Sequence, residues 1–206
     1  MRHLAGKLRH LRRFPRAESG LAAVEFALIL PVLIVMFFGV VELSLAVLCR
    51  NDIYNVASTA ADLIAQESVV APTDISNVYA AANTILYPYY PNFSTSKPTI
   101  RITSVIYDTV AKSTTAGKVA WTCIQPGSGT LSPANRAPSS TVTFAQPLLS
   151  SGSSVIMTEV AYSYASPTTQ VVTGPFNLID SFFTKPRRVS QIAAPTPLPT
   201  GCTSAG

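Results

Sequence analysis

The chain has 206 residues, of which 12% are charged, and its formal net charge is +5. Its mean hydropathy of +0.32 indicates a membrane segment. The positive excess lies in the first 20 residues, which carry six Lys and Arg against one Glu, whereas the remainder holds nine basic and nine acidic residues. A nucleic-acid-binding surface requires that excess on the folded part, so this distribution excludes nucleic acid as an expected partner.

A long apolar run follows the basic leader. It covers the 28 positions from 21 to 48, interrupted by Glu25, Glu42 and Ser44. About 20 helical residues span a bilayer core, and basic flanks stay on the cytoplasmic side. We therefore expect a cytoplasmic leader at 1–20, a transmembrane helix at 21–48 and an exported domain at 49–206.

Two other uses of such a run fit the residues less well. A cleavable secretory signal has an apolar region of about 7–15 residues that ends in small residues. This run is longer, and its far end reads "SLAVLCR". A lipoprotein signal would acylate Cys49, but the preceding Leu48 is bulkier than the small residue expected there.

The helical pattern continues beyond the membrane segment. Apolar residues between Ile53 and Ile64 recur at i, i+3, i+4 and i+7, with polar residues on the opposite face. Because the step Ala71-Pro72 disfavours helix, we expect one helix over 21–70, ~75 Å long. A membrane helix followed by a separate soluble helix fits the same periodicity.

A second helix is expected next, with Thr73 as its N-cap and Asp74 in its first turn. The segment Tyr87–Phe93, "YPYYPNF", contains two prolines and ends it. Its aromatic cluster is either a binding surface or loop packing, and the residues favour packing.

From Lys97 the hydrophobic period changes to two, which is typical of strands. Val119, Trp121 and Cys123 are expected to share one face of a strand. Strands are expected at 98–110, 117–124, 141–144 and 154–165, with 170–183 ambiguous, 185–192 as a last edge strand, 125–140 as a loop and 193–206 as a Pro-rich tail. The sequence predicts an α+β fold, with a long N-terminal helix, a short second helix and a small antiparallel β-sheet head.

The stretch "SGLAAVEFALILPVL" resembles the processing motif of the Tad/Flp branch of type IV pilins. That motif is a basic leader, a Gly, four residues, a Glu, an aromatic residue and a hydrophobic helix. Gly20 matches the last leader residue and Leu21 the first mature residue, while Glu25 and Phe26 match the Glu-aromatic pair. The resemblance implies that a membrane-embedded prepilin peptidase cuts after Gly20, where the backbone is unhindered and flexible.

Such a cut leaves a new ammonium at Leu21. Glu25 lies four residues later, one helical turn away on the same face. It can neutralise this ammonium or that of a neighbouring subunit, and negative charge is favoured at a helix N-terminus. The competing interpretation is that Glu25 only starts the helix and reaches the lipid headgroups.

The C-terminal part adds to the resemblance. "TEVAYSYASP", followed by "FFTKPRRVSQ", is similar to TadE-like proteins, the minor pseudopilins of the Tad system. The resemblance implies a single-pass protein of the bacterial inner membrane with a periplasmic domain, which assists pilus assembly and surface adhesion and can enter the extracellular pilus. The implied partners are prepilin peptidase, inner-membrane lipid, and other Tad pilins and pseudopilins through the hydrophobic helix.

Three cysteines are present, without a CxxC motif, so zinc and thioredoxin-like sites have no support. In an oxidising periplasm Cys123 and Cys202 are a reasonable disulfide pair. Cys49 is expected to be a small buried apolar residue. Three free thiols are the alternative.

Catalytic chemistry has little basis in the residues. The two histidines, His3 and His10, both lie in the leader, so a processed chain has none for a catalytic triad or a His-bearing metal site. Ser94 to Lys97 fits an S-x-x-K pattern inside a Ser/Thr-rich segment, where chance explains it better than a hydrolase. We expect no enzyme, cofactor or metal; the main alternative is an uncleaved single-pass membrane protein with a periplasmic scaffold or binding domain.

Overall fold

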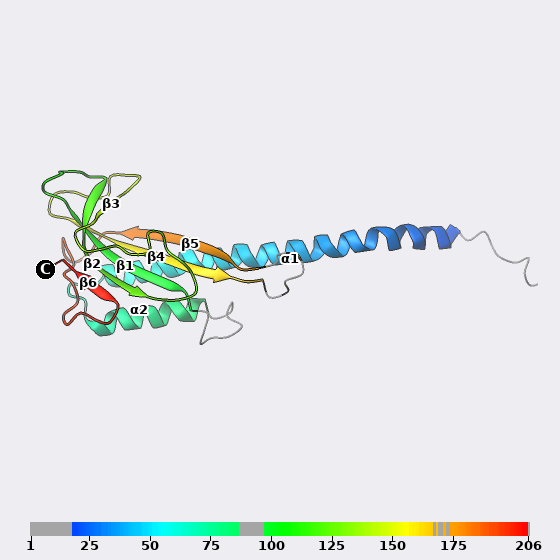
Figure 1. Ribbon diagram of the computed structural model, residues 1–206, viewed down its shortest axis with the longest axis horizontal. Helices are drawn as coiled ribbons and strands as arrows, with labels where there is room; N and C mark the ends of the chain where they lie inside the picture. Colours follow the sequence, from blue (N-terminus) through cyan, green and yellow to red (C-terminus); the bar gives the residue numbers. More distant parts are fainter. Residues whose placement is uncertain (1–17, 87–96, 167, 169–170, 172–173, 206) are drawn as a thin grey trace, which may run out of the picture.

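The computed structural model describes residues 18–86, 97–166, 168, 171 and 174–205. A helix far longer than the rest of the fold runs along the molecule, and the head packs on its C-terminal half (Figure 1). The expected α+β class is confirmed. The elements are α1 (Glu18–Ala65), α2 (Pro72–Ile85), β1 (Thr99–Tyr107), β2 (Ala116–Gln125), β3 (Thr141–Thr143), β4 (Ser154–Tyr164), β5 (Phe176–Thr184) and β6 (Cys202–Ser204).

Helix α1 is continuous from the apolar run into the head, as the single-helix expectation required. It ends at Ala65, five residues before the expected end at residue 70. The backbone N–H of Arg187 donates to the Ala65 carbonyl at 2.9 Å, which satisfies an acceptor left open at the helix end. Leaving the helix early also lets Val70 turn into the core, where it is 1% exposed.

The start of α2 differs from the expected cap. Ala71, not Thr73, is the N-cap, and Pro72 occupies the first helical turn. Proline has no N–H and a fixed φ, so it suits this position. The Asp74 carboxylate reaches back and accepts a 2.8 Å hydrogen bond from the Ala71 N–H, which closes the first turn.

All strand pairings are antiparallel, in the order β3-β2-β1-β4-β5, and β6 also pairs with β2. The expectation that Val119 shares a face with Trp121 and Cys123 is wrong. Trp121 is paired with Ser104 but Val119 with Val105, so a bulge inserts Ala120 in β2. An extra residue reverses the alternation, which sends Val119 to the face away from the helices.

The C-terminal region also differs from expectation. The segment 170–183, whose structure was ambiguous, contains most of β5, which pairs with β4 along its whole length. Residues 185–192, expected as an edge strand, do not form a strand. Pro186 has no N–H to donate to a ladder, and the chain instead crosses the end of the sheet. There the Ile192 carbonyl accepts a 2.9 Å hydrogen bond from the Trp121 indole. The segment expected as a Pro-rich tail ends in a short strand, β6, which pairs with β2.

The sheet has a core on each face. The larger one lies between the sheet and the two helices and includes Ile53 and Val56 of α1, Val78 of α2 and Ile102 of β1. The smaller one, on the opposite face, gathers Val105, Val119, Val142, Phe144, Leu149, Val155 and Met157. The aromatic segment Tyr87–Phe93 and residues 94–96 lie outside the described residues.

Candidate assembly surface

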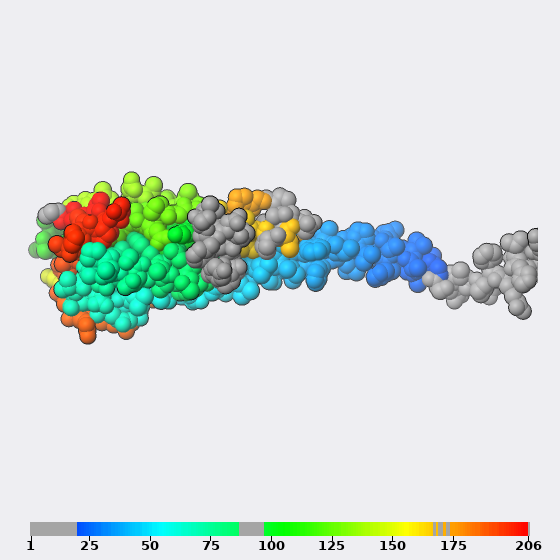
Figure 2. Space-filling model, turned by 90° about the horizontal axis from the view of Figure 1, so that it is seen from below, coloured from blue at the N-terminus to red at the C-terminus, as the bar shows by residue number. Residues whose placement is uncertain are grey.

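The N-terminal part of α1 stands clear of the head (Figures 1 and 2). Every residue from Gly20 to Phe37 is exposed, and the helix is long and apolar enough to cross a membrane. From Leu21 to Val41 it measures ~32 Å at 1.5 Å per residue, close to the ~30 Å thickness of a bilayer core. Such an apolar surface is favourable in lipid and unfavourable in water.

The head first contacts α1 near the end of this projecting part. Phe38 and Gly39 are partly covered, and Glu42 is 1% exposed. The Glu42 carboxylate accepts hydrogen bonds from the Thr168 hydroxyl and, at 3.2 Å, from the Val171 N–H, both in the β4–β5 connection. A buried carboxylate needs such donors. This charge in the apolar run therefore holds the head against the helix.

The residues of the predicted processing motif lie together on the projecting helix. Gly20 is in the first turn of α1, and Leu21, Glu25 and Phe26 follow on its exposed surface. Leu21 is 64% exposed and Phe26 59% exposed. Glu25 forms no ion pair with the described residues. The two carboxylates of the apolar run therefore differ, since Glu42 is bound within the fold whereas Glu25 faces outward.

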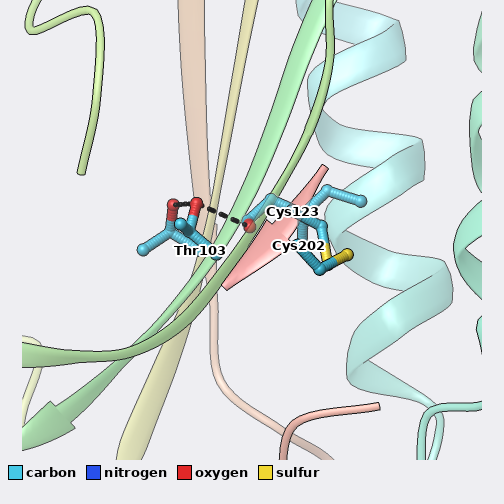
Figure 3. The surroundings of a disulfide bond; sticks show 5 residues. Thr103, Cys123 and Cys202 are labelled. Atoms are coloured by element: carbon cyan, nitrogen blue, oxygen red, sulfur yellow. Dashed lines mark hydrogen bonds between the residues drawn. A yellow bond between two sulfur atoms is a disulfide. The ribbon is translucent and has the colours of Figure 1, made fainter. Parts of the chain in front are cut away.

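The structure contains the disulfide expected between Cys123 and Cys202. It joins β2 to β6 across a Cα–Cα distance of 4.0 Å and a sequence separation of 79 residues. Figure 3 shows both cysteines on the side of the strands that faces the helices, with Thr103 on the opposite side. Cys49 is a buried free thiol, as expected.

A buried ion cluster lies on the sheet face opposite the helices, and the sequence analysis did not find it. Glu159 of β4 receives Arg101 of β1 and Arg136 of the β2–β3 connection, each with nitrogen–oxygen distances of 2.8 Å. Arg101 also donates to the carbonyls of Pro133 and Ala134 at 2.8 and 3.0 Å. Burial lowers the pKa of the Arg101 guanidinium, and the Glu159 charge opposes that shift.

This cluster fixes the β2–β3 connection on the sheet. Arg101 is 1% and Glu159 5% exposed, and they form an ion pair within the fold. Arg101 and Glu159 are opposite one another in the β1–β4 register. The pairing of two strands cannot be read from a single sequence. The signal that the sequence offered for this cluster was Arg101, a charged residue between the apolar strand residues Ile100 and Ile102.

No group of three or more metal-ligating side chains occurs among the described residues. The S-x-x-K pattern is described only at Lys97, which is exposed. Among the described residues, the candidate functional surface is the projecting part of α1 with its exposed Glu25.

Comparison with protein families agrees with this geometry. Residues 20–62 match the family model described as TadE-like protein. The N-terminal helix is therefore similar to that of TadE-like proteins. The match begins at Gly20 and covers nearly all of α1, but it does not extend to residues 158–192, where a further resemblance was expected. No curated protein and no solved structure matches the chain.

The match spans 43 of the 206 residues, all of them within α1. The matched family is a structural component of the Tad pilus.

Proposed function

We propose that this TadE-like protein is a minor pseudopilin of a Tad/Flp pilus, processed after Gly20, which assists pilus assembly and surface adhesion. One observation carries the proposal. The exposed apolar stretch of α1, which is of membrane-spanning length, starts directly after Gly20 and bears an outward-facing carboxylate one turn further on, at Glu25. The TadE-like match over this same helix supports the proposal.

The proposed topology follows from charge and length. The basic leader, residues 1–20, stays in the cytoplasm, and the membrane helix lies within 21–48. The head follows in the periplasm and includes the C-terminal half of α1. Because the head already covers Glu42, we place the outer edge of the lipid near Val41 on the side of the helix that bears the head.

Glu25 gives the helix its proposed role in assembly. Within lipid a lone carboxylate is costly unless it meets a cation. Removal of the leader by a prepilin peptidase creates such a cation, the ammonium of Leu21, on each subunit. Pairing with a neighbouring subunit's ammonium fixes the axial register between helices, while the small residues Ala22, Ala23 and Ala27 permit close approach.

The experiment is a Glu25→Ala substitution in cells that make the pilus. Insertion and leader removal should persist, because neither needs this carboxylate, whereas co-purification with other Tad pilins should fall by about tenfold or more. Ser44→Ala is the matched control, because among the described residues its hydroxyl bonds only within the helix, to the Val40 carbonyl at 2.7 Å. Normal co-purification of the Glu25→Ala protein would refute the register role.

One observation favours a second candidate. Helix α1 begins at Glu18, so Gly20 is helical rather than extended, and a peptidase must unwind this first turn before cutting. If it does not, the protein is an uncleaved single-pass membrane protein whose periplasmic domain acts as a scaffold or binding module.

A further inference from the structure

A cavity lies beside the buried ion cluster, on the sheet face away from the helices. Its volume is about 310 Å³, at the small end of the range for pockets that bind small molecules. Its floor is formed by β2 and β6, where Thr122 and Thr203 lie opposite one another. Thr122 also bonds to Thr103, which faces away from the helices in Figure 3. Residues 134–138 of the β2–β3 connection form the other side of the cavity.

The ion cluster beside this cavity carries one positive charge in excess. Two guanidinium groups, those of Arg101 and Arg136, share the single carboxylate of Glu159. Arg136 binds both oxygens of that carboxylate, through Nε and Nη2 at 2.8 Å each. A bidentate contact of this kind already matches one cation to one anion. In the ion pairs of the described residues neither arginine meets a second carboxylate, so the charge of Arg101 is left in excess.

Arg101 lines the cavity and is short of partners. Its side chain is 1% exposed, and Nη2 lies 2.8 Å from Glu159 Oε2. Nη2 is nevertheless buried without a hydrogen bond to the described residues. Burial lowers the pKa of the Arg101 guanidinium, and the like charge of Arg136 adds to that shift. A buried donor without an acceptor and a buried excess charge are both costly, and an anion in the cavity reduces both costs.

The remaining lining indicates which kind of anion fits. Asn135 and Thr203 offer an amide and a hydroxyl at exposed positions, whereas Ile124 and Pro138 offer apolar surface. These groups suit a ligand that has one carboxylate, several hydroxyls and an apolar ring face. The small volume favours a single ring over an extended chain. An acidic sugar has all of these properties.

We propose that this cavity binds a hexuronic acid, whose carboxylate lies against Arg101 and Arg136 and whose hydroxyls meet Asn135 and Thr203. The carboxylate supplies the second negative charge of the cluster, so the occupied site is neutral. The inference rests on the proposed function, because it gives the adhesive part of that function a ligand, the acidic sugar of a surface polysaccharide.

The test is titration calorimetry of the full chain in detergent at low ionic strength, with sodium D-glucuronate as the probe. D-Glucose lacks the carboxylate and acetate lacks the ring, so each retains only part of the proposed contacts. We expect glucuronate to bind about tenfold or more tightly than either comparison ligand.

Two substitutions locate the binding. Ala137→Phe fills the cavity from the exposed β2–β3 connection without a change of charge. Arg136→Gln removes the excess charge and leaves one arginine paired with Glu159. Each should weaken glucuronate binding about tenfold or more, with cooperative thermal unfolding as the check that the head is folded. Ala111→Phe, at an exposed position between β1 and β2 that does not line the cavity, is the matched control and should bind like the parent.

The proposal is overturned if the parent does not bind glucuronate, or if acetate binds equally well, which would leave a site for any small anion. Unchanged affinity in the folded Ala137→Phe protein would place the binding elsewhere and overturn it too. Tighter binding of the acidic peptide Gly-Glu-Gly would assign a peptide ligand instead. N-terminal sequencing of the chain from pilus-making cells reports leader removal independently, so failure of this site and failure of the pseudopilin function are told apart.

Discussion

At the scale of single residues, two carboxylates in one apolar helix have opposite environments. Glu42 is bound by Thr168 and Val171 and is buried, whereas Glu25 is exposed on a surface that we assign to lipid and neighbouring helices. A buried charge is tolerated when donors surround it, and a lone charge in lipid requires a partner. The first carboxylate therefore belongs to folding, and we assign the second to assembly.

Replacing Glu42 with Ala tests this assignment. The change leaves the Val171 N–H and the Thr168 hydroxyl without this acceptor, so we expect a loss of about 1–3 kcal/mol in unfolding free energy. Hydrogen exchange at the Val171 amide should speed up. Glu42→Gln keeps an acceptor oxygen and should show a smaller effect; unchanged exchange in Glu42→Ala would contradict the role.

At the scale of elements, the two faces of the sheet are stabilised differently. Both faces have an apolar core, but the face away from the helices also carries the Arg101–Glu159–Arg136 cluster, which ties β1 and β4 to the β2–β3 connection. The disulfide holds the C-terminal strand β6 on β2. Long connections rich in Pro, Gly and Ser are thus held by polar and covalent contacts, because they offer few apolar side chains for packing.

Removing Glu159 should destabilise the head strongly. Glu159→Ala leaves two neighbouring guanidinium groups without their counter-charge, and we expect a loss of about 3–5 kcal/mol. The matched control is Asp62→Ala, which breaks the Asp62–Arg187 pair, whose side chains are 40% and 57% exposed; it should cost under about 1 kcal/mol. Denaturant unfolding of the full chain in detergent measures both, and equal losses would contradict the account.

The disulfide should contribute through the unfolded chain. Its loop of 79 residues gives an expected stabilisation of roughly 4–5 kcal/mol in the chain-entropy model. The double variant Cys123→Ser and Cys202→Ser should lose about that amount in denaturant unfolding. Cys49→Ala, which removes the free thiol, should not reproduce the loss; a double variant as stable as the parent would contradict this prediction.

The sequence predicted those elements whose signals are local. The apolar run, the strands around Ile102 and Trp121, and the short strand at 141–144 all carry their own periodicity. The face of Val119, the strand at 176–184 and the cluster around Glu159 depend on strand pairing and a bulge, which only the assembled sheet specifies. Of the candidate site, the motif at Gly20 and Glu25 was readable, whereas the role of Glu42 was not.

At the scale of the whole molecule, the protein is a rod with a head at one end (Figure 1). Helix α1 spans ~32 Å of proposed lipid contact, and its C-terminal half then packs against the sheet of the head. Contacts at Glu42 and Tyr54 couple the two parts. In the proposed function, an axial register set by the membrane helix would therefore pass directly to the surface of the head.

The most direct test of the central claim is the N-terminus of the mature protein. We predict that intact mass and N-terminal sequencing of the chain from pilus-making cells show Leu21 as the first residue. In cells lacking the prepilin peptidase the chain should begin at or near Met1. A chain that retains its leader in the presence of the active peptidase would contradict the account and leave an uncleaved membrane-anchored scaffold.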